Sequence, residues 1–162
     1  MPPPSPARQG AAVDQAGGYA PGVTGSTIHN FRSYLHFLAP GGCFHLIEGH
    51  PFALIFDDRP QTPELRMLYP YFQGREPIRE EQEGSYAAPN APIHSVQHVW
   101  IHSLADVIGS LLRAGLQIES FAEYPYVAWK MFPWMTQRTD GSWELPGGAA
   151  TLPLMFSLSA RK

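Results

Sequence analysis

The chain has 162 residues, a net charge of −3 and a pI near 6.1, which argues against binding to nucleic acid or to an anionic membrane surface. Hydrophobic residues make up 44% of the chain and charged residues only 15%, so we expect a buried core and some apolar surface for a ligand or a partner. The single cysteine, Cys43, excludes an internal disulfide framework, and no apolar run reaches the ~20 residues of a membrane span. The first residues lack the apolar centre of a secretory signal, so we predict a cytoplasmic protein.

The opening segment, residues 1–25, is rich in Pro, Gly and Ala and carries almost no aliphatic side chains. We predict that it is a disordered tail, and that residues 26–162 form the folded part of the chain. A helix is predicted over residues 26–38, where apolar side chains recur at helical spacing. These side chains are Ile28, Phe31, Leu35 and Leu38.

The next stretch reads LAPGGCFHLIEGHPF. Pro40, Gly41 and Gly42 end the predicted helix and turn the chain, and residues 43–48 then have the apolar composition of a buried strand. A helix, a short turn and a buried strand are half of a parallel α/β unit, which needs a neighbouring strand reached by a crossover. Nothing upstream of Ser26 resembles that neighbour.

Residues 57–98 are rich in Pro, Tyr and Glu, and we predict that they are irregular. Long structureless stretches in compact domains are usually lids or binding loops, so residues 57–100 are interpreted as a lid. Within them, the acidic run of residues 75–84 is interpreted as a solvated face of the lid.

Three histidines, His94, His98 and His102, are spaced four residues apart, as metal ligands on one helix face would be. Apolar residues interleave with them, and the helix signal begins only at Ser103, which favours an extended segment. We therefore predict no metal site and interpret these side chains as lid histidines.

The clearest helix begins at Ser103, with Asp106 three residues later as an acidic variant of the capping box. Gly115 is predicted to end this helix in the left-handed conformation. Strands are predicted over residues 116–124 and 152–160, and a hairpin is predicted to turn at Asp140 and Gly141.

The chain contains, in this order, the segments LAPGGCFHLIEGHPF, WIHSLADVIGSLLRAGLQIESFAEYPY and LPLMFSLSARK. Together they resemble the C-terminal half of a class I S-adenosylmethionine-dependent methyltransferase of the bacterial small-molecule type. The resemblance covers residues 35–162. It implies a Rossmann-like α/β sheet with strand order 3-2-1-4-5-7-6, in which only strand seven is antiparallel. Residues 43–48, 116–124 and 152–160 would be strands five, six and seven, with strand seven inserted between the other two.

The chain departs from this family in its cofactor half. The resemblance implies S-adenosylmethionine as the cofactor, held by a glycine-rich loop after strand one and an acidic residue that ends strand two. This chain has no G-x-G-x-G after any predicted strand, so strands one to four are absent and no cofactor-binding residue is assigned. We therefore expect the domain to be incomplete, and the chain alone to be inactive.

Candidate catalytic residues are Glu48 and His50, because they end the strand that would face the active site and either side chain suits a general base. The alternative is a polar strand end followed by a Pro-terminated turn. Candidate substrate-binding residues in the predicted lid are Tyr69, Tyr71, His98 and Trp100.

Two functional hypotheses follow, with a hydrolase built on the histidine cluster as a third. In the first, the chain methylates a small molecule, provided that a partner supplies the cofactor half. In the second, it is a non-catalytic remnant that binds a partner chain or a second copy of itself through the exposed edge of strand five.

Overall fold

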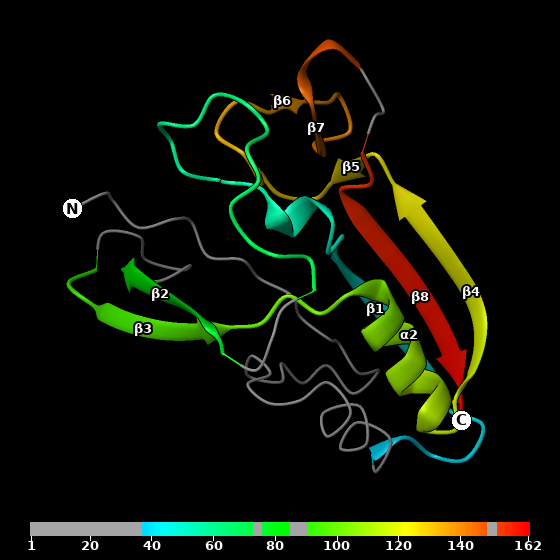
Figure 1. The fold of residues 1–162 in the computed structure, drawn as a ribbon. Coiled ribbons are helices and arrows are strands. Elements are labelled where there is room, and N and C mark those ends of the chain that lie inside the picture. The colour runs from blue at the N-terminus through cyan, green and yellow to red at the C-terminus, as the bar shows by residue number, and fades with distance from the viewer. Residues whose placement is uncertain (1–36, 73–75, 85–90, 149–151) are drawn as a thin grey trace.

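The computed structural model describes residues 37–72, 76–84, 91–148 and 152–162. Its main sheet is formed by β1 (Cys43–Gly49), β8 (Met155–Arg161) and β4 (Gln117–Tyr124), in the order β1-β8-β4. Figure 1 shows β8 between the other two strands, and it is antiparallel to both, so β1 and β4 run in the same direction. This is the order and these are the directions expected for the three strands, whereas their place in a larger Rossmann-like sheet stays a prediction.

One helix covers one face of this sheet. α2 (Leu104–Arg113) begins where Ser103 Oγ accepts a hydrogen bond from the backbone N–H of Asp106 at 3.1 Å. It ends before Gly115, whose φ of +88° is the left-handed conformation predicted for it. Because β4 follows the helix directly and runs back along it, the N-terminal end of α2 lies towards the carboxyl ends of β1 and β4 (Figure 1).

The core of this part lies between α2 and the sheet. In β1 and β8 alternate side chains point to the helix, as the period of two requires, and in β4 a register shift between Ile118 and Ser120 interrupts the alternation. The buried cluster consists of Phe44, Leu46, Val107, Leu111, Leu116, Phe156, Leu158 and Ala160.

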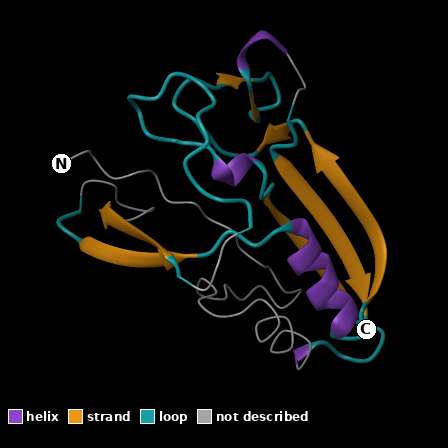
Figure 2. Ribbon diagram, in the orientation of Figure 1, coloured by secondary structure: helices purple, strands orange, loops and turns teal. Residues whose placement is uncertain are grey.

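A second, smaller sheet has the order β5-β7-β6 and is formed by β5 (Tyr126–Val127), β7 (Trp143–Glu144) and β6 (Thr136–Gln137). β6 and β7 are antiparallel, and Gly141 between them has a φ of +87°, which confirms the predicted hairpin. The short helices η1 (Ala53–Ile55) and η2 (Pro146–Gly148) are far apart in sequence but lie in the same region of the fold as this sheet (Figure 2). Its buried core consists of Ala53, Val127, Met131, Phe132, Met135, Leu145 and Leu154.

The prediction that residues 57–98 are irregular was wrong for part of the segment. β2 (Ile78–Glu83) and β3 (His94–Val99) form an antiparallel hairpin, which lies apart from the main sheet in Figure 1. The acidic run is therefore largely a strand. Its sequence lacks the apolar alternation that announces a strand, and cross-strand polar pairs such as Glu83 with His94 accompany the backbone pairing instead.

Other predictions fall partly or wholly outside the described residues. The tail of residues 1–25 lies outside them, as does the predicted helix of residues 26–38 except for Phe37 and Leu38. The last strand begins at Met155, three residues later than predicted. No helix among the described residues is long and apolar enough to span a membrane.

Candidate active site at the carboxyl ends of β1 and β4

Two acidic residues lie at corresponding positions near the carboxyl ends of the two parallel strands. Glu48 of β1 and Glu123 of β4 both pair with Phe156 of the central strand. Because directly paired residues share a face of the sheet, Glu48, Phe156 and Glu123 form one row on the face that α2 covers. Ligands of α/β sheets bind beyond the carboxyl ends of such strands, so this row is where a site is expected.

His50 connects the two strands across this row. Its backbone N–H donates to the carbonyl of Leu154 at 2.9 Å, which fixes the chain just after β1. Its ring meets the ring of Phe156 edge to face, with centroids 6.2 Å apart, and its Nε2 lies 2.9 Å from Oε1 of Glu123. His50 is thus held over β8 by its contacts with Leu154 and Phe156, and it reaches across to Glu123 of β4.

The two nitrogens of the His50 ring have different partners. Nδ1 accepts a hydrogen bond from the backbone N–H of Phe52 at 3.1 Å, so Nδ1 carries no proton. Nε2 must then carry the proton and donate it to Glu123. The backbone of Phe52 therefore selects the neutral Nε2–H tautomer of His50.

Burial shifts the pKa values of the two predicted catalytic residues in opposite directions, because it favours the neutral form of each. His50 is only 4% exposed, and burial lowers its pKa, an effect that the neighbouring Glu123 carboxylate partly offsets. Burial raises the pKa of Glu48 to about 7, and the backbone N–H of Gly49, which donates to Oε1 at 3.2 Å, opposes the rise. Near neutral pH the imidazole is therefore uncharged, and the Glu48 carboxyl is partly protonated and partly ionised.

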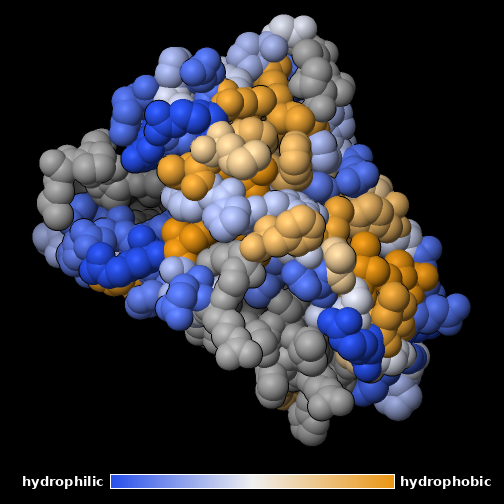
Figure 3. All heavy atoms as spheres, in the orientation of Figure 1, coloured by the Kyte–Doolittle hydropathy of each residue, from blue (hydrophilic) through white to orange (hydrophobic). Residues whose placement is uncertain are grey.

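Aromatic residues lie beside this edge. The hydroxyl of Tyr71 accepts a hydrogen bond from the backbone N–H of Leu104 at 3.2 Å, at the first turn of α2. Its ring contacts Phe52 and Phe72 edge to face, with centroids 6.4 Å and 5.0 Å apart. Phe72 is 81% exposed. Figure 3 shows that apolar residues also gather at the surface of the face that it draws. The aromatic cluster is joined to the polar row through Phe52, whose backbone N–H binds His50.

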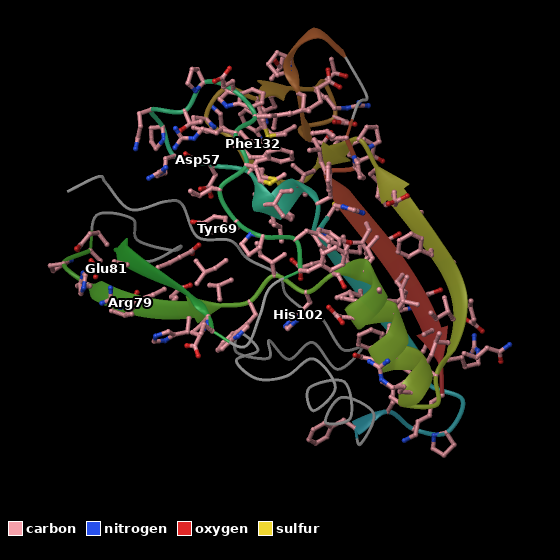
Figure 4. All side chains as sticks on the ribbon, in the orientation of Figure 1. Asp57, Tyr69, Arg79, Glu81, His102 and Phe132 are labelled. Carbon is pink, nitrogen blue, oxygen red and sulfur yellow. The ribbon has the colours of Figure 1, made fainter. Side chains whose placement is uncertain are left out.

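A buried carboxylate, that of Asp57, lies in the loop after η1 and is labelled in Figure 4. The Asp57 carboxylate is fully buried and accepts hydrogen bonds from Arg59 Nε and Nη2 at 2.8 and 2.7 Å, from Thr62 Oγ1 at 2.9 Å, and from Arg66 Nη2 at 3.1 Å. The Arg59 guanidinium is the main reason that the pKa of Asp57 lies far below its ordinary value. With its oxygens committed to these donors, Asp57 anchors the loop.

The structure brings together only some of the predicted site residues. Glu48 and His50 lie at the carboxyl ends, and Tyr71 lies nearby at the start of α2, where its hydroxyl has the structural role of accepting from Leu104. Tyr69 is half-buried in the loop before it, and its backbone N–H donates to the carbonyl of Ile55. Trp100 is half-buried between β3 and α2. His98 is exposed on β3 opposite Arg79, a residue that Figure 4 labels on the hairpin, so His98 is not part of this site.

Sequence analysis missed Glu123, although the rule that selected Glu48 also applies to it, because it stands at the end of a predicted parallel strand.

Across the part of the chain that the structure describes, no group of three or more His, Cys, Asp or Glu side chains is arranged to hold a metal ion. His94 contacts Glu83 at 2.8 Å within the hairpin.

No protein-family model and no curated protein matches the sequence. Among solved structures, the fold is similar to that of a candidate S-adenosylmethionine-dependent methyltransferase from Listeria monocytogenes, with 16% identity and a TM-score of 0.44, over 81% of this chain and 52% of that one. It is also similar to an S-adenosylmethionine-dependent methyltransferase from Mesorhizobium loti, with 20% identity and a TM-score of 0.45, over 84% of this chain and 55% of that one. The chain thus spans about half the length of these structures.

Proposed function

We propose that the chain is the C-terminal part of a class I S-adenosylmethionine-dependent methyltransferase that acts on a small molecule. The observation that carries this proposal is the sheet order β1-β8-β4, with β8 antiparallel between two parallel strands. In this interpretation β1, β4 and β8 are strands five, six and seven of a Rossmann-like sheet, and α2 is the crossover helix that leads into strand six.

The described residues do not fit the cofactor itself. β1 is followed by His50 and Pro51, and β4 by Pro125, so neither parallel strand leads into a glycine-rich loop that would let the backbone approach S-adenosylmethionine. We therefore assign the cofactor site to residues outside the described part of this chain. The residues described here would supply the methyl acceptor's side of the site.

On that side, Glu48 is the candidate general base. Its pKa of about 7 lets its carboxylate take a proton from an acceptor at neutral pH, as the reaction requires when the acceptor group is protonated. His50 is a positioning residue in this proposal, because the Phe52 N–H and the Glu123 carboxylate engage both of its ring nitrogens.

Calorimetric titration with S-adenosylmethionine tests the assignment of the cofactor half. We expect no saturable heat for the chain alone, and saturable binding when the chain is co-expressed with a polypeptide that carries strands one to four. Saturable binding by the chain alone would refute this division of the site. An experimental structure in which β8 lies at an edge of the sheet would refute the family assignment itself.

A second proposal concerns the outer edge of β1. Among the described strands, β1 pairs only with β8, so no other described strand covers its second edge, and Ile47 on the face away from α2 is 60% exposed. A non-catalytic chain would bind a partner chain or a second copy through this edge. Sedimentation velocity separates the two proposals, because a monomer at all concentrations would argue against self-association through β1.

A further inference from the structure

The contact between His50 and Glu123 places an oriented, solvent-accessible carboxylate in the candidate site, which the predicted catalytic pair, Glu48 and His50, does not provide. His50 is fixed by backbone hydrogen bonds from both sides, through its own N–H to Leu154 and through Nδ1 from Phe52. It donates Nε2–H to Oε1 of Glu123, whose side chain is 48% exposed. A rigid neutral donor therefore orients a solvent-accessible carboxylate.

No other described residue donates a hydrogen bond to the Glu123 carboxylate, so its second oxygen can accept from a ligand. A neutral imidazole donates without cancelling the negative charge, so Glu123 retains it. A ligand group that carries both N–H donors and a positive charge makes a stronger hydrogen bond to such a carboxylate than a neutral donor does.

We propose that Glu123, oriented by His50, binds the amino group of the methyl acceptor, so that the substrate class of the proposed enzyme is amines. The role of the amine as methyl acceptor rests on the proposed function, whereas its binding to Glu123 does not depend on methyl transfer. Glu48 stands in the same cross-strand row and takes the ammonium proton, which leaves the nitrogen lone pair available. Phe52, whose backbone N–H binds His50, contacts Tyr71 edge to face, and we assign these two rings to the apolar part of the amine.

The test uses benzylammonium chloride as the probe and benzyl alcohol as its uncharged analogue. Each is titrated into the ¹⁵N-labelled chain, while NMR follows the His50 ring nitrogens and the Glu123 amide. We expect saturable shifts at both residues with benzylammonium and none with benzyl alcohol. Equal responses to the two probes, or no response to benzylammonium, would overturn the proposal.

Variants assign the binding to the carboxylate. Glu123→Gln keeps the size of the side chain and removes its charge, and we expect the affinity for benzylammonium to fall at least about tenfold. Glu119→Gln is the matched control, because Glu119 is also an exposed carboxylate of β4 but pairs with Arg161 at the other end of the strand. An unchanged affinity in Glu123→Gln, or an equal loss in both variants, would refute the role of Glu123.

The positioning role of His50 has its own readout. We expect the ring of the unaltered chain to be the neutral Nε2–H tautomer at pH 7, which the ¹⁵N shifts report directly. His50→Gln places an amide N–H near the position of Nε2 and should keep most of the affinity, whereas His50→Leu should lose it although both retain their fold by circular dichroism. A charged ring or an Nδ1–H tautomer would contradict the role. If benzylammonium binds as expected but the chain co-expressed with strands one to four does not bind S-adenosylmethionine, the amine site stands and the methyltransferase proposal falls.

Discussion

His50 and Glu123 are 73 residues apart in sequence, and their side chains meet at 2.9 Å between Nε2 and Oε1. The contact crosses β8, so it forms only when the central strand has brought the ends of β1 and β4 to a common edge. Assembly of the main sheet and assembly of the candidate site are therefore the same event.

The pKa of Glu48 makes the stability of the protein depend on pH. Between the ordinary value of 4.5 and the folded value of about 7, the folded state binds more protons at Glu48 than the unfolded state, so this contribution to stability falls as pH rises through that window. Glu48→Gln removes the effect, and we expect it to stabilise the fold at pH 8 by as much as about 3 kcal/mol, with little change at pH 4. Urea unfolding of both proteins at the two pH values measures this, and a pH-independent difference would contradict the assigned pKa.

Gly115 is expected to tolerate β-branched residues poorly because of its backbone conformation alone. Its φ is +88°, and a Cβ there would meet no atom within 4 Å, so Gly115→Val should destabilise the fold through conformational strain of roughly 1–2 kcal/mol. Gly109→Ala is the contrasting change within α2, because a Cβ there meets only the flexible end of Arg113. It should leave stability unchanged or raise it by up to about 1 kcal/mol. Thermal unfolding of both variants tests this, and similar losses would show that the φ of Gly115 is not the cause.

Asp57 is expected to contribute strongly to the stability of the loop after η1. Asp57→Asn removes the charge that Arg59 and Arg66 share, and we expect a loss of about 2–3 kcal/mol at pH 7. Because the folded pKa of Asp57 is lowered, its contribution is present above the ordinary value of 3.8 and is lost as pH falls below it, so the two proteins should converge in acid. Asp140→Asn, in the exposed β6–β7 turn, is the control and should have a smaller effect.

The first turn of α2 has two separate caps, whose losses should add. Ser103 accepts from the N–H of Asp106, and Tyr71 accepts from the N–H of Leu104. Ser103→Ala and Tyr71→Phe should each cost about 1 kcal/mol, and the double variant about twice that. Denaturant midpoints of the three variants test whether the two losses add. An unchanged midpoint in Tyr71→Phe would contradict the capping role of its hydroxyl and leave substrate binding as its predicted role.

Local signals in the sequence account for the elements that were predicted correctly. Ser103 and Gly115 bracket α2 with a cap and a left-handed glycine. Residues 43–48 form the predicted strand, but it is buried on one face only, because Phe44 and Leu46 face α2 whereas Ile47 is 60% exposed. The β2–β3 hairpin was missed because its first strand is polar on both faces, and neither hydrophobic periodicity nor a tight-turn dipeptide marks it.

The candidate site was only partly predictable, for a different reason. The rule for strand ends selects Glu48 and His50 from local sequence alone. The choice of tautomer, by contrast, depends on the backbone of Phe52, and the orientation of Glu123 depends on a side chain from another strand. Such relationships have no local signature, because they arise only from the tertiary fold.

The central strand of the main sheet is also the one encoded last among the three. During synthesis, residues 43–49 and 117–124 leave the ribosome before the strand that joins them, and neither can form its native ladder until residues 155–161 have emerged. Until residues 155–161 emerge, β1 and β4 lack their pairing partner in the nascent chain, whereas both strands of the β2–β3 hairpin are available early. Chaperone binding to the nascent chain is therefore expected to be strongest in this interval.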